Sequence, residues 1–219
     1  MVRYREKKPA PCPRITVPDV AQKANDIVVA CTRDREDLEK AHFQWEKVQK
    51  LNDLGWECMD AQAEWIFCKE RSRKETKALE RYVKECQSLR REITDGMRAA
   101  NTFNQFLIVI PSYRNSKSRA ELVQDLHDLF ILCEHYEEDL RKGGFNTALI
   151  RKAFDESWNL SNQIADTVLE RERLLKQVRH RNEVCKATVD LIRDIGGFAR
   201  TVFANDPRKS DYRTSRRHF

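Results

Sequence analysis

Apolar residues recur at intervals of three and four positions through most of this 219-residue chain. This spacing places them along one face of an α-helix, and the polar positions between them form a solvated face. The pattern is absent from residues 1–17, which hold three of the six prolines, and from the polar residues 206–219. We therefore predict a helical bundle over 18–205, flanked by a mobile basic N-terminal segment at 1–17 and a mobile basic C-terminal tail at 206–219.

The first half of the bundle predicts two helices. The first extends from Pro18 to Leu54, and the second from Trp56 to Phe103. The sequence NDLG at 52–55 favours a break between them. A continuous helix is the alternative, because Gly55 keeps nearly the same phase as the apolar positions around it. One apolar face near the start of the second helix consists of Met59, Ala63, Ile66 and Phe67.

The second half of the bundle predicts two further helices. Ser118 and Glu121 match a capping box at the start of the third helix, and the glycine pair at 143–144 marks its end. The fourth helix covers about 146–195 without a Pro or Gly, which corresponds to a length of about 75 Å. A second glycine pair, at 196–197, predicts a short apolar helix that folds back onto the bundle.

Composition supports a helical fold. Charged residues make up 35% of the chain, and Gly and Pro contribute six residues each, which is typical of long helices with solvated faces. The segment 103–117 interrupts the pattern around Pro111, and its conformation stays open. No internal repeat of solenoid length is evident. We predict an all-α fold, either an elongated four-helix bundle or coiled-coil-like antiparallel helical hairpins.

The positive charge of the chain is concentrated at its two ends. The formal net charge is +6, but residues 1–17 carry +4 and residues 206–219 carry +3, which leaves −1 for the bundle. Basic ends of this kind can bind phosphate groups without sequence specificity. The C-terminal candidates for such nucleic-acid contacts are Arg208, Lys209, Arg213, Arg216 and Arg217.

Cysteine usage and hydropathy indicate a cytoplasmic protein. The seven cysteines are scattered without a C-x-x-C pair, which fits free thiols in a reducing compartment. The N-terminus lacks the apolar core of a signal peptide, and no run of apolar residues is long enough for a transmembrane segment.

Metal and catalytic motifs are weak. Glu39 and His42 form a Glu-x-x-His pair of the kind that binds iron in helical bundles, but a di-iron site needs two such pairs. His127 and Glu134 lie two helical turns apart on one face and are the second weak candidate pair for a metal. No Gly-rich phosphate loop and no nucleophile motif occurs. We expect no catalytic residues and no cofactor.

These patterns favour a structural role. Helices of unequal length cannot bury one another fully, so we expect a non-enzymatic scaffold or assembly subunit that presents apolar helix faces to itself, as a homo-oligomer, or to another protein. A nucleic-acid-associated protein that uses its basic ends is the alternative, and a metal-dependent bundle enzyme is the second alternative. The four tryptophans, which fall on predicted helices, are assigned to core packing: Trp45, Trp56, Trp65 and Trp158.

Overall fold

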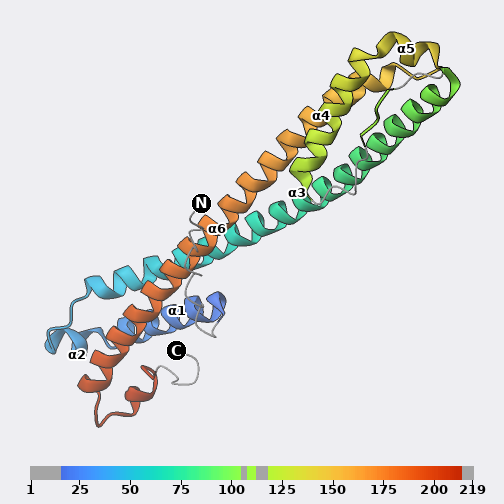
Figure 1. Cartoon of the computed structure of the whole chain (residues 1–219). Helices are drawn as coiled ribbons and strands as arrows, with labels where there is room; N and C mark the ends of the chain where they lie inside the picture. The colour runs from blue at the N-terminus through green and yellow to red at the C-terminus, as the bar shows by residue number, and fades with distance from the viewer. Residues whose placement is uncertain (1–15, 105–107, 112–117, 214–219) are drawn as a thin grey trace. The chain divides into compact units, whose positions relative to one another are not determined.

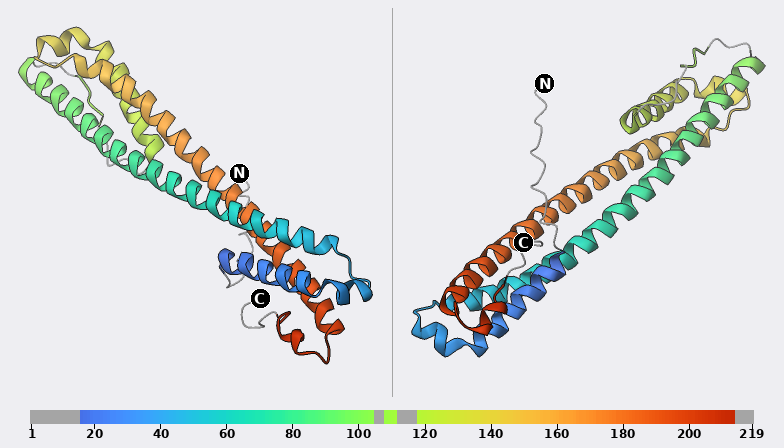
Figure 2. Two further views of the ribbon diagram at one scale, coloured as in Figure 1. Left: turned by 180° about the vertical axis from the view of Figure 1, so that it is seen from behind. Right: turned by 90° about the horizontal axis from the view of Figure 1, so that it is seen from below.

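The computed structural model describes residues 16–104, 108–111 and 118–213 (Figures 1 and 2). The helices in these ranges are α1 (Val17–Arg33), α2 (Arg35–Lys40), α3 (Glu46–Asn104), α4 (Arg119–His135), α5 (Glu137–Lys142), α6 (Ala148–Val202) and the 3-10 helix η1 (Pro207–Ser210). No strand occurs among the described residues, so the all-α prediction is confirmed. The predicted N-terminal segment lies outside the described residues up to position 15.

The starts of α1, α4 and α6 are predicted, whereas the breaks after α1, α2 and α4 are not. The capping box of α4 is confirmed, because the Ser118 hydroxyl accepts the N–H of Glu121 and the Glu121 carboxylate accepts the N–H of Ser118. The break predicted at 52–55 is wrong, because α3 continues through Gly55. The glycine pair at 196–197 also lies inside a helix, so the apolar residues after it continue α6 up to Val202 and do not form a separate helix. A glycine inside a helix costs only about 1 kcal/mol, which the packing of a long helix outweighs.

The two halves of the chain contain the same order of helices. α1, α2 and α3 have 17, 6 and 59 residues, and α4, α5 and α6 have 17, 6 and 55. The N-caps Thr16 and Ser118 are 102 positions apart, and the same offset relates the starts of the helices that follow. At this offset, 20 of the 89 residues from 16 to 104 are identical. The chain therefore contains two copies of one helical repeat, 16–104 and 118–206, with a period longer than that of a solenoid.

Side-chain contacts recur along with the helices. The Gln22 amide donates to Asp26 at 2.9 Å, and at the equivalent positions Gln124 donates to Asp128 at 2.7 Å. Buried apolar positions also coincide, which means that the two repeats use the same faces of their helices for the core. Examples of these buried pairs are Ile27 and Leu129, Cys31 and Cys133, Leu38 and Leu140, and Ile93 and Ile195.

Each short helix ends in a Schellman motif. After α2, the N–H of Phe43 donates to the carbonyl five residues before it at 3.0 Å, and Phe145 makes the same bond after α5 at 2.9 Å. The turn residue is left-handed in both motifs, with φ of 61° at His42 and 78° at Gly144. Glycine is the usual residue at such a position. Because His42 replaces it in the first repeat, the sequence pattern does not reveal where α2 ends.

The described residues up to 69 and from 173 onward form one compact unit, which we call the terminal unit. Here α1, α2 and the first part of α3 pack against the last part of α6. The core consists of apolar side chains from all four helices and from the C-terminal segment, including Val20, Ile27, Leu51, Ile192 and Tyr212.

Residues 70–172 form a second compact unit, the middle unit. Here α4, α5 and the first part of α6 pack against the last part of α3. Arg90 of α3 pairs with Asp125 of α4 at 2.5 Å, and the rings of Phe130 and Phe154 join α4 to α6. Each unit therefore combines the short helices of one repeat with the last part of the long helix of the other. A single repeat would leave the apolar faces of its helices uncovered.

Candidate functional site

The structure does not assemble the weak metal candidates into a site. Glu39 lies on the surface of the terminal unit and pairs with Arg35 at 2.7 Å, and His42 occupies the exposed left-handed turn. His127 and Glu134 belong to α4 in the middle unit, where the His127 ring lies against aromatic neighbours. Within the described ranges, no cluster of three or more His, Cys, Asp or Glu side chains could hold a metal ion.

Two of the C-terminal candidates for phosphate contact, Arg208 and Lys209, are bound to other groups of the protein. The Arg208 guanidinium binds Asp206 at 2.7 Å and Asp37 at 2.9 Å, and Lys209 donates to a backbone carbonyl at 3.1 Å. Arg213 is exposed at the end of this range. The other two predicted residues, Arg216 and Arg217, lie outside the described residues.

The C-terminal segment is held by a buried carboxylate at the joint of α1 and α2. Asp34 accepts the Tyr212 hydroxyl at 2.9 Å and the Arg33 guanidinium at 2.7 Å. Tyr212 is fully buried and stacks on Phe203. The polar composition of the C-terminal segment does not predict this packing, which is possible because the Tyr212 hydroxyl finds a partner inside the core.

These contacts shift the ionisation of the groups that make them. The adjacent Arg33 guanidinium, with help from Tyr212, lowers the pKa of Asp34 against the opposing effect of burial. Burial and the hydrogen bond to Asp34 raise the pKa of Tyr212 above its ordinary range. The network therefore holds a charged carboxylate and a neutral phenol at neutral pH, which is an arrangement that binds the C-terminal segment to the helices rather than a catalytic pair.

Five of the six cysteines among the described residues are buried. Burial raises the pKa of Cys31 to about 12, and it does the same for Cys133 at the equivalent position of the second repeat. Cys58 differs, because its hydrogen bonds with Cys185 and Thr188 lower its pKa against the opposing effect of burial. Its side chain is nevertheless fully buried in the core of the terminal unit. A thiolate without access to solvent is a poor nucleophile for an external substrate.

An exposed apolar face on α3 is the most prominent surface feature of the terminal unit. Trp56 is 70% exposed and Phe67 is 66% exposed, and Met59 and Ile66 are also exposed. Together with Ala63, these residues follow helical spacing along one side of α3, and we call them the α3 face. Large apolar side chains gathered in this way on a surface mark a site of protein interaction.

Acidic residues border the α3 face. The 18 residues from 51 to 68 contain four carboxylates and no Lys or Arg, in a chain whose formal net charge is +6. All four are exposed, and they follow the same helix at intervals of three and four positions: Asp53, Glu57, Asp60 and Glu64. The α3 face therefore combines apolar contacts with a local excess of negative charge.

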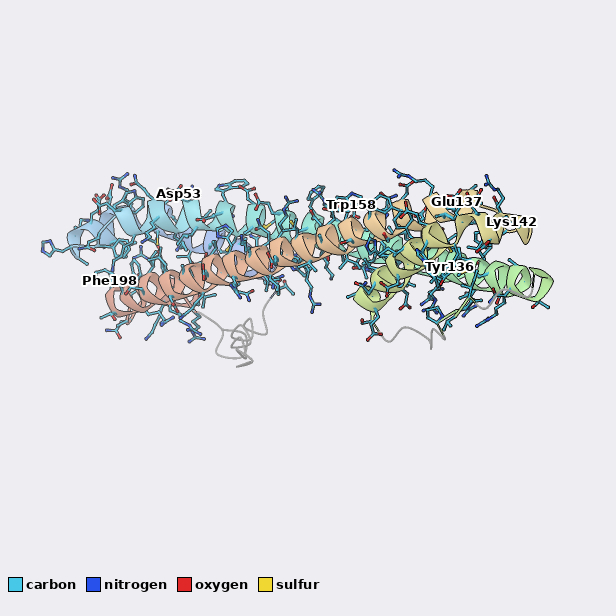
Figure 3. All side chains as sticks on the ribbon, turned by 45° about the horizontal axis from the view of Figure 1, so that its top comes forward. Asp53, Tyr136, Glu137, Lys142, Trp158 and Phe198 are labelled. Carbon is cyan, nitrogen blue, oxygen red and sulfur yellow. The ribbon has the colours of Figure 1, made fainter. Side chains whose placement is uncertain are left out.

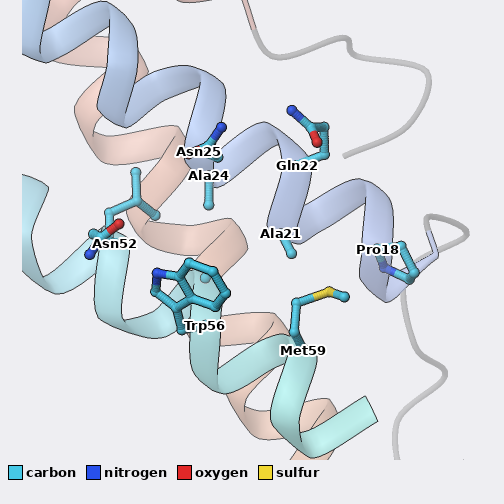
Figure 4. Close-up of a pocket in the computed structure, with 10 residues that line it drawn as sticks. Pro18, Ala21, Gln22, Ala24, Asn25, Asn52, Trp56 and Met59 are labelled. Carbon is cyan, nitrogen blue, oxygen red and sulfur yellow. The ribbon is translucent and has the colours of Figure 1, made fainter. Parts of the chain in front are cut away.

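A groove between α1 and α3 adjoins the face. Its volume is about 410 Å³, and Figure 4 shows Trp56 and Met59 projecting from α3 toward Ala21 and Ala24 of α1. The groove exists because the side chains that meet there are small. At Gly55, an added Cβ would lie 3.5 Å from the Cβ of Ala24, so the helices approach closely while larger side chains remain at the rim.

Sequence reasoning identified part of this face and missed the rest. The apolar face with Met59 and Phe67 was predicted, but the assignment of all four tryptophans to the core is wrong for Trp56 and Trp158, which are both exposed. Trp158 is labelled in Figure 3. The signal that could have revealed the site is the run from 51 to 68 without a basic residue.

Comparisons of the chain with protein-family models, with curated proteins and with solved structures found no match. Among the described residues, no helix combines the length and the apolar character that are needed to cross a lipid bilayer. The interpretation of the surface therefore rests on the residues themselves.

Proposed function

We propose that this protein is a non-enzymatic helical scaffold of the cytoplasm whose α3 face binds a basic amphipathic helix of a partner protein. The observation that carries the proposal is the exposure of Trp56 and Phe67 on one side of α3, beside the groove between α1 and α3. A partner helix would place apolar side chains on this face and in the groove, in the manner of helix-in-groove recognition.

The charge around the face selects the kind of partner. Asp53, Glu57, Asp60 and Glu64 attract Lys and Arg side chains that flank the apolar positions of the incoming helix. A second copy of this chain is a less suitable occupant, because self-pairing through the α3 face would bring the same carboxylates together. Light scattering coupled to size-exclusion chromatography distinguishes these cases, since a dimer that dissociates when the face is mutated would identify the face as a self-interface instead.

Binding is tested with a fluorescent Leu–Lys peptide of about 14 residues, long enough to present one apolar helical face. We expect it to bind the full chain about tenfold more tightly than a Leu–Glu peptide of the same length. Replacing Trp56 with Ser and Glu64 with Lys should each weaken binding by about tenfold. Circular dichroism before each titration verifies that the helices are intact.

Lys209→Ser is a control outside the face, and it should leave the affinity unchanged. Equal binding of the two peptides would contradict the selection by charge. Full affinity in the Trp56 variant would contradict the assignment of the α3 face.

A further inference from the structure

The second repeat carries a counterpart of the α3 face. At the offset of 102 positions, Trp56 corresponds to Trp158, and Ile66 and Phe67 correspond to Val168 and Leu169. Trp158 is 66% exposed and Leu169 is 52% exposed, and Val168 is exposed to a similar degree. We call Trp158, Val168 and Leu169 the α6 face. It belongs to the middle unit, whereas the α3 face belongs to the terminal unit.

The local charge recurs in part. The 18 residues from 153 to 170, which are equivalent to 51–68, again contain four carboxylates and no Lys or Arg. Asp155 and Asp166 occupy the positions of Asp53 and Glu64 and are exposed, although Asp155 pairs with Arg151 at 3.3 Å. The other two carboxylates are less accessible, because Glu156 accepts the Tyr82 hydroxyl and the buried Glu170 pairs with Arg71. Core packing does not account for Trp, β-branched and large apolar residues at the same places in both repeats, because these side chains are exposed.

We infer that the chain is bivalent, and that the α6 face binds a second copy of the same kind of basic amphipathic helix as the α3 face. This inference rests on the proposed function and extends it, because a scaffold with two equivalent faces joins two partner molecules. Two linked sites also raise the avidity for any partner that is itself paired.

The two faces differ in apolar content and in the adjoining groove, and Ser161 stands in the α6 face where the α3 face has Met59. The groove beside the α3 face depends on Ala24 and Gly55, and the second repeat has Leu126 and Ser157 at those positions. Both of these residues are buried, and both have larger side chains than Ala24 and Gly55, which leaves less room for an equivalent groove. The α6 face therefore offers surface contacts with less depth, and it binds the more weakly of the two.

The stoichiometry of binding tests the inference. The probe is the Leu–Lys peptide, titrated into the full chain by calorimetry and observed in parallel by native mass spectrometry. Two variants each disable one face: Trp56→Ser with Phe67→Ser, and Trp158→Ser with Leu169→Ser. All four side chains are more than half exposed, so these changes leave the core intact.

We expect two peptides per wild-type chain, one per chain in each variant, and none when the two variants are combined. The site that remains in the α6-face variant should be the tighter one. A single peptide per wild-type chain, lost only in the α3-face variant, would overturn the inference and leave the proposed function standing. No binding to the wild-type chain would overturn both, and two peptides bound to the combined variant would show that the sites lie elsewhere.

Discussion

At the joint between its first two helices, the first repeat carries Asp34, whereas the second repeat carries Tyr136 at the equivalent position. Asp34 is buried and accepts hydrogen bonds from Tyr212 and Arg33. The Tyr136 ring lies edge-on against its neighbour His135. The two repeats therefore keep the same helices and core positions, and they differ where the first repeat binds the C-terminal segment. The terminal unit depends on a polar contact that the middle unit does not use.

The largest effect is expected when this polar contact is removed. Replacing Asp34 with Ala should lower the free energy of unfolding by about 3 kcal/mol, because the fully buried Tyr212 hydroxyl loses its acceptor and Arg33 keeps only its exposed partner Asp211. Urea denaturation followed by circular dichroism measures the change. Glu39→Ala is the matched control, since it removes an exposed ion pair with Arg35 that contributes less than about 1 kcal/mol. Equal losses in the two variants would mean that the C-terminal segment is not held by Asp34.

Acid should reduce the difference between the wild type and the Asp34 variant. The folded state lowers the pKa of Asp34, so the carboxylate contributes stability above its unfolded pKa of about 3.9. That contribution is lost as the pH falls through the lower, folded value. Urea midpoints measured between neutral pH and strong acid should therefore converge at the acidic end. A constant difference down to the lowest pH would indicate that the variant acts through packing alone.

Substitutions at the two Schellman motifs test the equivalence of the repeats, and we expect stability changes that are smaller and of opposite sign. His42 and Gly144 occupy the same left-handed position, with φ of 61° and 78°. A residue with a Cβ is strained there by about 1–2 kcal/mol. His42→Gly should therefore stabilise the chain by about 1 kcal/mol, and Gly144→Ala should destabilise it by about the same amount. Changes of the same sign in the two variants, measured by urea denaturation, would break the equivalence of the repeats.

The parts of the fold that follow from local chemistry were predictable from the sequence. The capping box at Ser118 and the helix end at Gly143-Gly144 depend on residues within one turn of each other, and both are present. The end of α2 was not predictable, because His42 takes a conformation that glycine normally signals. The packing of Tyr212 was missed for a different reason, since its partner Asp34 lies 178 positions away in the sequence.

The candidate site was predictable only in part. Helical spacing grouped Met59, Ala63, Ile66 and Phe67 on one face, and the structure agrees with that grouping. Whether such a face is buried depends on which helix covers it, and the pattern within one helix does not contain that information. The exposure of Trp56 and Trp158 at equivalent positions becomes informative once the two repeats are aligned, because the comparison then separates retained surface residues from retained core residues.

The smallest effect is expected at two glycines inside α3, one in each unit. At Gly55 an added Cβ meets Ala24 at 3.5 Å, which is ordinary contact, so Gly55→Ala should stabilise the chain by about 0.7 kcal/mol through helix propensity. At Gly96 the added Cβ would lie 3.0 Å from the ring of buried Phe145, so the same substitution should give no stabilisation. The urea denaturation midpoints of the two variants measure these changes in stability. A loss of stability in Gly55→Ala would mean that α1 and α3 pack more tightly than this structure shows. Equal gains in both would mean that Phe145 moves freely, and that the middle unit is the looser of the two.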